Sequence, residues 1–211
     1  MKYKLVMFDF DGTLADSFPW FIQVANTVAD KYRFKRIQPH EIETLRGYSG
    51  RQLVQHLGVP WWKLPLIGRH MRQLTASNIG QISLFEGVDR VLRELAEAGV
   101  TLALVTSNSY ANARHVLGPD NTARITDYEC DVSIFGKRSR FQRILKRRGV
   151  APHEALCIGD ELRDWEAASK AGIPFGAVSW GFTQREALEA RAPAEVFTRM
   201  EQIIERVLMR G

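Results

Sequence analysis

The sequence has few of the features that mark secreted proteins, membrane-spanning proteins or proteins with cysteine and histidine metal sites. It contains two cysteines and five histidines in 211 residues, and the histidines show no spacing typical of metal ligands. No apolar run approaches the roughly 20 residues needed to cross a bilayer. The N-terminus passes directly from basic residues into a short strand-like run, which does not suit a signal peptide. We therefore expect a cytoplasmic protein in which Cys130 and Cys157 are reduced and packed in the core.

Repeats and low-complexity segments are also lacking, and nothing indicates binding to nucleic acid or to a membrane. The net charge of +5 is mild. A basic cluster follows Lys137, without interleaved aromatic residues or a nucleic-acid-binding signature. We interpret it as the solvated face of an amphipathic helix that turns Phe141, Ile144 and Leu145 inward. Its members are Arg138, Arg140, Arg143, Lys146, Arg147 and Arg148.

The sequence does contain an alternation of apolar, strand-like runs with helical patterns. The strand-like runs cover residues 4–10, 101–108, 155–161 and 175–181, with a weaker one at 128–136. The helical patterns cover residues 88–99, 141–149 and 162–172. This alternation, with near-continuous apolar runs, indicates a parallel sheet buried between helices on both faces. We predict an α/β fold with a Rossmann-like parallel sheet as its core.

Residues 18–82 interrupt this alternation, because they show helical periodicity and no convincing strand. The helical segments are residues 20–34, 42–47, 50–58 and 66–80. The simplest account is an all-helical insertion joined to the core by linkers near Leu14–Phe18 and Ser83–Gly87. We predict a core of residues 1–16 and 84–211, and a helical cap of residues 17–83.

The first strand-like run ends on two aspartates, Asp9 and Asp11. Side chains two apart in a strand share one face, and ligands of open α/β sheets bind at the carboxyl ends of the strands. The other strand ends supply Thr106-Ser107-Asn108, Gly136-Lys137 and Asp160-Glu161, with Asp164 one helical turn beyond Asp160. Converging carboxylates repel one another unless a cation binds them, and oxygen ligands suit Mg2+. Lysine and hydroxyl groups suit the oxygens of a phosphoryl group.

These strand ends resemble, in order, the four motifs of the haloacid dehalogenase-like hydrolase superfamily: FDFDGTL, TSN, a lone lysine and GDELRD. The helical insertion is similar to the small cap of its phosphoglycolate phosphatase and β-phosphoglucomutase-like members. The stretches FEGVDRVLRELAEAGVTLALVTSN and AVSWGF also resemble family segments, so the match extends over essentially the whole chain. An aspartate at the second position, Asp11, excludes the dehalogenases and the phosphonate-cleaving members. A chance match of four motifs in the right order is rare.

The resemblance implies a Mg2+-dependent phosphatase that works through an aspartyl-phosphate. It implies that Asp9 is the nucleophile and that Asp11 is the general acid and base, with its backbone carbonyl on the metal. Thr106 would hold a phosphoryl oxygen, and Gly12 would allow the backbone to approach the phosphate. Lys137 would neutralise charge between the nucleophile and the phosphoryl group. The amides of Ser107 and Asn108 would assist, and the metal ligands would be Asp9, Asp11, Asp160 and Asp164, the last directly or by orienting another ligand.

One position departs from the family pattern, and the role of another stays open. Many relatives have a proline after the motif lysine, whereas this sequence reads Gly136-Lys137-Arg138-Ser139-Arg140. Either Lys137 or Arg138 can therefore be the cation at the site, and we favour Lys137 because it fits the strand-end pattern. Glu161 either supports a metal ligand or lies at the surface.

The segment LRGYSGRQL in the predicted cap resembles the loop that related caps lower onto the active site. Its polar residues are Arg46, Tyr48, Ser49 and Arg51. They either contact the part of the substrate beyond the phosphate or stabilise the bend between two helices. We favour the first interpretation.

The resulting hypothesis is a phosphatase that hydrolyses a small phosphorylated metabolite, with a phosphoglycolate-like monoester as the family-level candidate. One alternative is a phosphomutase of the β-phosphoglucomutase type, which has the same core motifs but keeps water out. Another is a binding or regulatory module with a disused site. We expect neither nucleic acid nor a membrane as a partner, and the sequence leaves the oligomeric state open.

Overall fold

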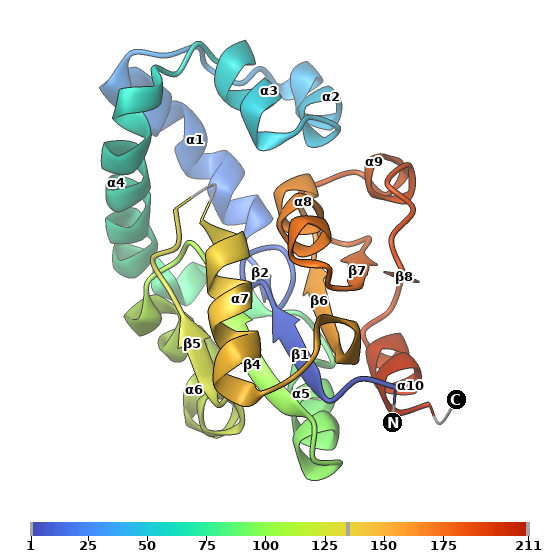
Figure 1. Ribbon diagram of the computed structural model, residues 1–211. Coiled ribbons are helices and arrows are strands. Elements are labelled where there is room, and N and C mark those ends of the chain that lie inside the picture. The colour runs from blue at the N-terminus through green and yellow to red at the C-terminus, as the bar shows by residue number, and fades with distance from the viewer. Residues whose placement is uncertain (1, 134–135, 210–211) are drawn as a thin grey trace.

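A parallel β-sheet forms the centre of the protein (Figure 1). The computed structural model describes residues 2–133 and 136–209, and within them six strands lie in the order β5-β4-β1-β6-β7-β8. The strands are β1 (Leu5–Phe8), β4 (Thr101–Val105), β5 (Asp127–Glu129), β6 (Ala155–Gly159), β7 (Phe175–Val178) and β8 (Glu195–Phe197). β1 pairs in parallel with both β4 and β6. The strand that carries the first motif therefore lies in the interior of the sheet.

Helices cover both faces of this sheet (Figure 1). One face packs against α5 (Val88–Glu97), α6 (Tyr110–Arg124) and α10 (Glu201–Leu208), and the other against α7 (Lys137–Arg148), α8 (Leu162–Ala171) and α9 (Arg185–Glu189). Along β1, Val6 and Phe8 enter the first core while Leu5 and Met7 enter the second. This alternation confirms the predicted Rossmann-like α/β core. Among the described residues, no helix combines the length and the apolar character needed to cross a membrane.

The two edge strands differ from the sequence prediction. The weak strand predicted at 128–136 is β5 at Asp127–Glu129, and residues 134–135 of the prediction lie outside the described residues. β8 at the opposite edge was not predicted at all. Both edge strands have three residues, which is too few to form a recognisable apolar run.

The segment between β1 and β4 is helical. It contains α1 (Phe18–Tyr32), α2 (Ile42–Arg46), α3 (Gly50–His56) and α4 (Leu64–Ser77), with 3-10 turns η1 (Pro39–Glu41), η2 (Trp61–Lys63) and η3 (Ile79–Gln81). We call residues 18–81 the helical insertion, and it lies above the carboxyl ends of the strands in Figure 1. The segments predicted as linkers form a short antiparallel ribbon, β2 (Ala15–Asp16) with β3 (Ser83–Leu84). Two residues per strand carry no sequence pattern, so this ribbon was missed.

The sequence suggested that the basic face of α7 is solvated, but several of its arginines also form ion pairs. Four of its arginines form ion pairs with two acids of the edge strand β5, Asp127 and Glu129, whose side chains are buried. The arginines are Arg140, Arg143, Arg147 and Arg148. The sequence interpretation missed this network because the partner acids are distant in the chain. The network attaches the helix to the edge of the sheet.

Asp127→Asn tests how much this network stabilises the fold. Its carboxylate accepts hydrogen bonds from Arg147 at 2.7 Å and from Arg148 at 2.5 Å. We expect the free energy of unfolding, measured by chemical denaturation, to fall by about 1.5–3 kcal/mol, the usual range for a charged hydrogen bond.

Asp30→Asn is the matched control, because its pair with Arg36 is exposed and 3.6 Å long. The control should change the free energy of unfolding by less than about 0.5 kcal/mol. Equal effects of the two substitutions would show that burial of the Asp127 ion pair adds nothing to the free energy of unfolding.

Candidate active site

Three buried carboxylates meet at the carboxyl edge of the sheet. Asp9 follows β1, Asp160 follows the neighbouring strand β6, and Asp164 lies in the first turn of α8. One carboxylate oxygen from each lies within 4.8 Å of the others. The pairing of β1 with β6 explains this convergence, because neighbouring parallel strands end at the same edge.

Lys137 joins two of these carboxylates. It is the first residue of α7, and its Nζ lies 2.8 Å from Asp9 Oδ1 and 2.5 Å from Asp164 Oδ1. Its side chain is 3% exposed. Burial lowers the pKa of Lys137, but the charges of Asp164 and Asp9 outweigh burial and raise it above the usual value for lysine. Of the two candidate cations that the sequence left open, the structure brings Lys137 to Asp9, while Arg138 is exposed.

Asp160 is held by two residues that the sequence analysis did not single out. Thr13 Oγ1 donates to one carboxylate oxygen at 2.7 Å, and the backbone amide of Phe182 donates to the other at 2.8 Å. Two glycines leave room for this carboxylate. A Cβ at Gly12, where φ is +77°, would lie 2.3 Å from Asp160 Oδ2, and a Cβ at Gly181 would lie 2.2 Å from Asp160 Cβ. The sequence showed the segments DGT and AVSWGF, but not that they meet at Asp160.

The carboxylate cluster has the properties expected of a divalent-cation site. Burial, with the charges of neighbouring acids, raises the pKa of Asp160 well above its usual range. Burial and the charge of Asp9 raise the pKa of Asp164 to about 7. Asp9 Oδ2 is buried and has no hydrogen-bond partner among the described residues. A bound cation would favour the ionised carboxylates and give this oxygen a ligand, and an all-oxygen donor set suits Mg2+.

Asp11 has a different environment from the cluster. Its Oδ2 accepts a hydrogen bond from Asn108 Nδ2 at 3.1 Å, and burial together with the charge of Asp9 raises its pKa to about 6. Asn108 is in turn oriented by Asn112, whose Nδ2 donates to Asn108 Oδ1 at 2.9 Å. The resemblance assigned the amides of Ser107 and Asn108 to the phosphate and gave no role to Asn112. The structure turns the Asn108 side chain toward Asp11, while the backbone amide of Asn108 donates to Thr106 Oγ1. A carboxyl group with a pKa near 6 can both donate and accept a proton near neutral pH.

Thr106 and Ser107 lie at the end of β4, the strand on the other side of β1. Thr106 is fully buried, and its Oγ1 accepts a hydrogen bond from the Asn108 amide at 2.9 Å. Its hydroxyl hydrogen can still donate to another group. The Ser107 carbonyl accepts a hydrogen bond from Arg72 of α4 at 3.4 Å, which is one contact between the helical insertion and the core.

The polar residues of the segment LRGYSGRQL lie in different places. Arg46 donates to the carbonyls of Gly181 at 3.0 Å and Phe182 at 3.1 Å, so it joins α2 to the turn that holds Asp160. The Tyr48 ring packs edge-on against His56. Ser49 caps α3 by accepting from the Gln52 amide. Ser49 and Arg51 line a cavity together with Lys137.

Comparison with known proteins agrees with this geometry. The family model described as haloacid dehalogenase-like hydrolase matches residues 6–178. A phosphoglycolate phosphatase from Synechococcus elongatus is 33% identical over 90% of each chain, and one from Vibrio vulnificus strain CMCP6 is 28% identical over 99% of this chain and 97% of its own. The crystal structure of a predicted phosphoglycolate phosphatase from Lactobacillus plantarum superimposes with a TM-score of 0.80 at 25% identity, covering 97% of this chain and 99% of that one. The chain therefore belongs to the haloacid dehalogenase-like hydrolase family and is a phosphoric monoester hydrolase.

Proposed function

We propose that the protein hydrolyses a small phosphorylated metabolite through a phosphoryl intermediate on Asp9, with Mg2+ as its metal. The observation that carries this proposal is the position of Lys137 Nζ between Asp9 and Asp164, beside a third buried carboxylate. The names of the relatives make a phosphoglycolate-like monoester the candidate substrate.

In the first step, a carboxylate oxygen of Asp9 attacks phosphorus and the bond from phosphorus to the alcohol oxygen breaks. Asp11 gives its proton to the departing oxygen, and its pKa of about 6 leaves part of the population protonated near neutral pH. Lys137 offsets the negative charge between Asp9 and the phosphoryl group, because its Nζ touches Asp9. The Thr106 hydroxyl donates to a phosphoryl oxygen, assisted by the amide of Ser107, while the Asn108 amide donates to Thr106 Oγ1 and so orients this hydroxyl.

In the second step, water attacks phosphorus and the bond to Asp9 breaks, which releases phosphate and restores the carboxylate. Asp11 is now ionised and takes the proton from the attacking water, which returns it to its starting state. The hydrogen bond from Asn108 keeps this carboxylate in place during both transfers. Gly12 lets the backbone pass close to the phosphate.

The metal would be held by the side chains of Asp9, Asp160 and Asp164 and by the backbone carbonyl of Asp11. When bound, Mg2+ neutralises negative charge on the phosphoryl oxygens. Thr13 and the Phe182 amide position Asp160 for this role, because each donates to one of its oxygens.

We propose that residues 17–83 act as a cap over a core of residues 1–16 and 84–211, and that the protein works in the cytoplasm without a nucleic-acid partner. A phosphomutase would use the same acids, but the relatives reported above are phosphatases, which favours transfer to water. The intact acids and lysine argue against a disused site.

A phosphate-release assay tests the function. We expect 2-phosphoglycolate to be hydrolysed in the presence of Mg2+, with activity lost in EDTA and restored by added Mg2+. The absence of phosphate release from every phosphomonoester tried, including p-nitrophenyl phosphate, would overturn the proposal. Isomer formation from a sugar phosphate without phosphate release would show a mutase.

Asp9→Asn should remove turnover and leave the fold intact, because the carboxylate is the attacking group. We expect kcat to fall by more than about 10³-fold, as is usual when a nucleophile is removed. The exposed Asp30→Asn variant is the control and should keep wild-type activity. Residual activity within about tenfold of wild type, in protein free of deamidation, would assign the nucleophile elsewhere.

Asp11→Asn should affect substrates according to their leaving groups. An alkyl phosphate such as 2-phosphoglycolate needs protonation of its leaving oxygen, whereas p-nitrophenyl phosphate hardly does. We expect kcat for 2-phosphoglycolate to fall by about 10²–10⁴-fold, the usual contribution of a general acid, and that for the aryl ester to fall much less. Equal losses on the two substrates would mean that Asp11 serves the metal or the fold instead.

A further inference from the structure

A cavity of about 250 Å³ lies between the helical insertion and the core. Its wall is formed by the start of α3, the start of α7 and one side of α8. Five lining residues are cations and one is an acid: Arg51, Lys137, Arg138, Arg163, Lys170 and Glu166. Lys137, Arg163 and Lys170 have carboxylate partners. Cations still outnumber acids when these partners are included, which favours an anionic occupant.

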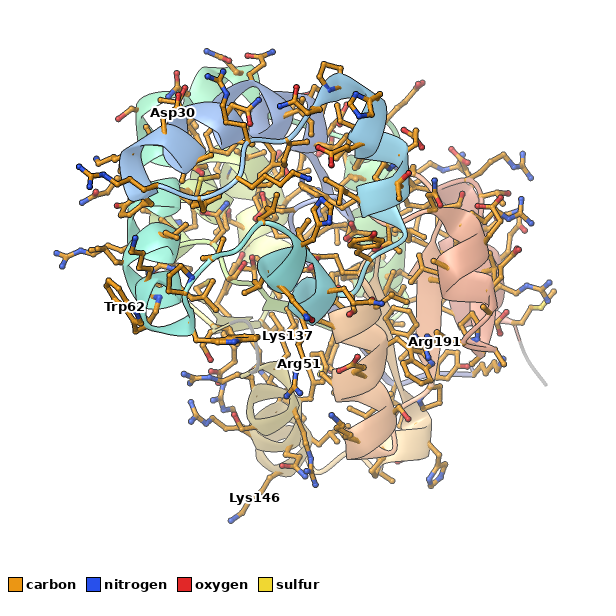
Figure 2. All side chains as sticks on the ribbon, turned by 90° about the horizontal axis from the view of Figure 1, so that it is seen from above. Asp30, Arg51, Trp62, Lys137, Lys146 and Arg191 are labelled. Atoms are coloured by element: carbon orange, nitrogen blue, oxygen red, sulfur yellow. The ribbon has the colours of Figure 1, made fainter. Side chains whose placement is uncertain are left out.

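The cavity adjoins the phosphoryl site. Lys137 belongs to its wall and also contacts Asp9 at 2.8 Å. Figure 2 shows Arg51 of the helical insertion beside Lys137 of the core, seen from above. A molecule whose phosphate lies at Asp9 can therefore extend its other end into this cavity.

Arg163 is a lining cation to which the sequence motifs assigned no role. It precedes Asp164 on α8, and its side chain is only 18% exposed. One end of its guanidinium is held by Glu161, because the Arg163 Nη2 atom lies 2.5 Å from Glu161 Oε1. Its Nε is buried and has no hydrogen-bond partner among the described residues. A buried donor without a partner is costly, so a turn of the guanidinium that brings this nitrogen to an acceptor in the cavity would be favourable.

We propose that Arg163 is a specificity residue that binds a negatively charged group on the alcohol part of the substrate, in the cavity that Arg51 also lines. This inference rests on the proposed function and deepens it. Asp9, Lys137 and Thr106 account for the phosphoryl end, which leaves the part of the guanidinium that does not contact Glu161 for a second anion. The substrates are then small phosphomonoesters whose alcohol carries a carboxylate or a second phosphate.

A purely structural role for Arg163 makes a different prediction. If the guanidinium only pairs with Glu161 beside Asp164, its loss disturbs the metal site and slows every substrate alike. If it binds the second anion, its loss slows only substrates that carry one. Selectivity between matched substrates therefore separates the two roles.

The test compares kcat/KM for three alkyl phosphates in wild type and in Arg163→Gln, at saturating Mg2+. 2-Phosphoglycolate carries a carboxylate, ethylene glycol bisphosphate carries a second phosphate, and 2-hydroxyethyl phosphate carries neither. We expect the ratio of kcat/KM for an anionic substrate to kcat/KM for the neutral one to fall by about 10- to 150-fold in Arg163→Gln. This is the equivalent of one charged hydrogen bond. The anionic substrate that loses more identifies the natural second group.

Arg191→Gln is the matched control, because it makes the same change to an exposed arginine that packs over Trp165, away from the cavity (Figure 2). It should leave all three values of kcat/KM unchanged. Arg163→Lys keeps a positive charge and should lose less selectivity than Arg163→Gln. It also replaces Arg163→Gln as the test if that variant does not fold.

An unchanged ratio in the Arg163 variants, whether through equal losses or no loss, would overturn this inference and leave the proposed function standing. So would a wild-type preference for the neutral substrate. Failure of wild type to release phosphate from any of the three compounds and from p-nitrophenyl phosphate would overturn the proposed function itself, and this inference with it.

Discussion

The contact of Lys137 with Asp9 and Asp164 is the interaction on which the arrangement of the site depends. Parallel strands bring Asp9 and Asp160 to one edge of the sheet and the first turn of α8 adds Asp164, and burial makes the mutual repulsion of these carboxylates strong. One buried ammonium offsets part of that charge, and α7 begins at the residue that supplies it. The remaining negative charge and the unpartnered oxygen of Asp9 favour a metal ion. The Lys137 ammonium thus reduces the repulsion among these carboxylates, and the same positive charge can offset negative charge on a phosphoryl group.

A single turn connects this site to the helical insertion. The amide of Phe182 donates to Asp160, while the carbonyls of Gly181 and Phe182 accept from Arg46 of α2. A movement of α2 would therefore shift Asp160, because Gly181 and Phe182 connect the two. Gln184 adds to the attachment, because its side chain donates to the Glu43 carbonyl at 2.7 Å. Docking of the insertion and the geometry of the carboxylate cluster share these backbone groups.

The proposed basis of substrate choice draws on both parts of the molecule. The helical insertion contributes Arg51 to the cavity, and the core contributes Arg163 from α8. The family resemblance identified GDELRD for its aspartates, and the arginine between them had no assigned role. Its neighbours in space, rather than in sequence, indicate a role at the cavity. Arg46 sits in the predicted specificity loop but contacts the core backbone instead.

The sequence by itself determined the central strands, the helical insertion and the candidate acids, because these depend on local patterns: apolar runs, helical periodicity and charges at strand ends. Only the tertiary structure decided the partners. It joined Asn108 to Asp11, Thr13 to Asp160, and the arginines of α7 to the edge strand β5. Each of these contacts joins side chains that the chain separates by 11 to 147 positions. Such contacts depend on strand order and on the direction of side chains at the end of the sheet, and no local pattern encodes either.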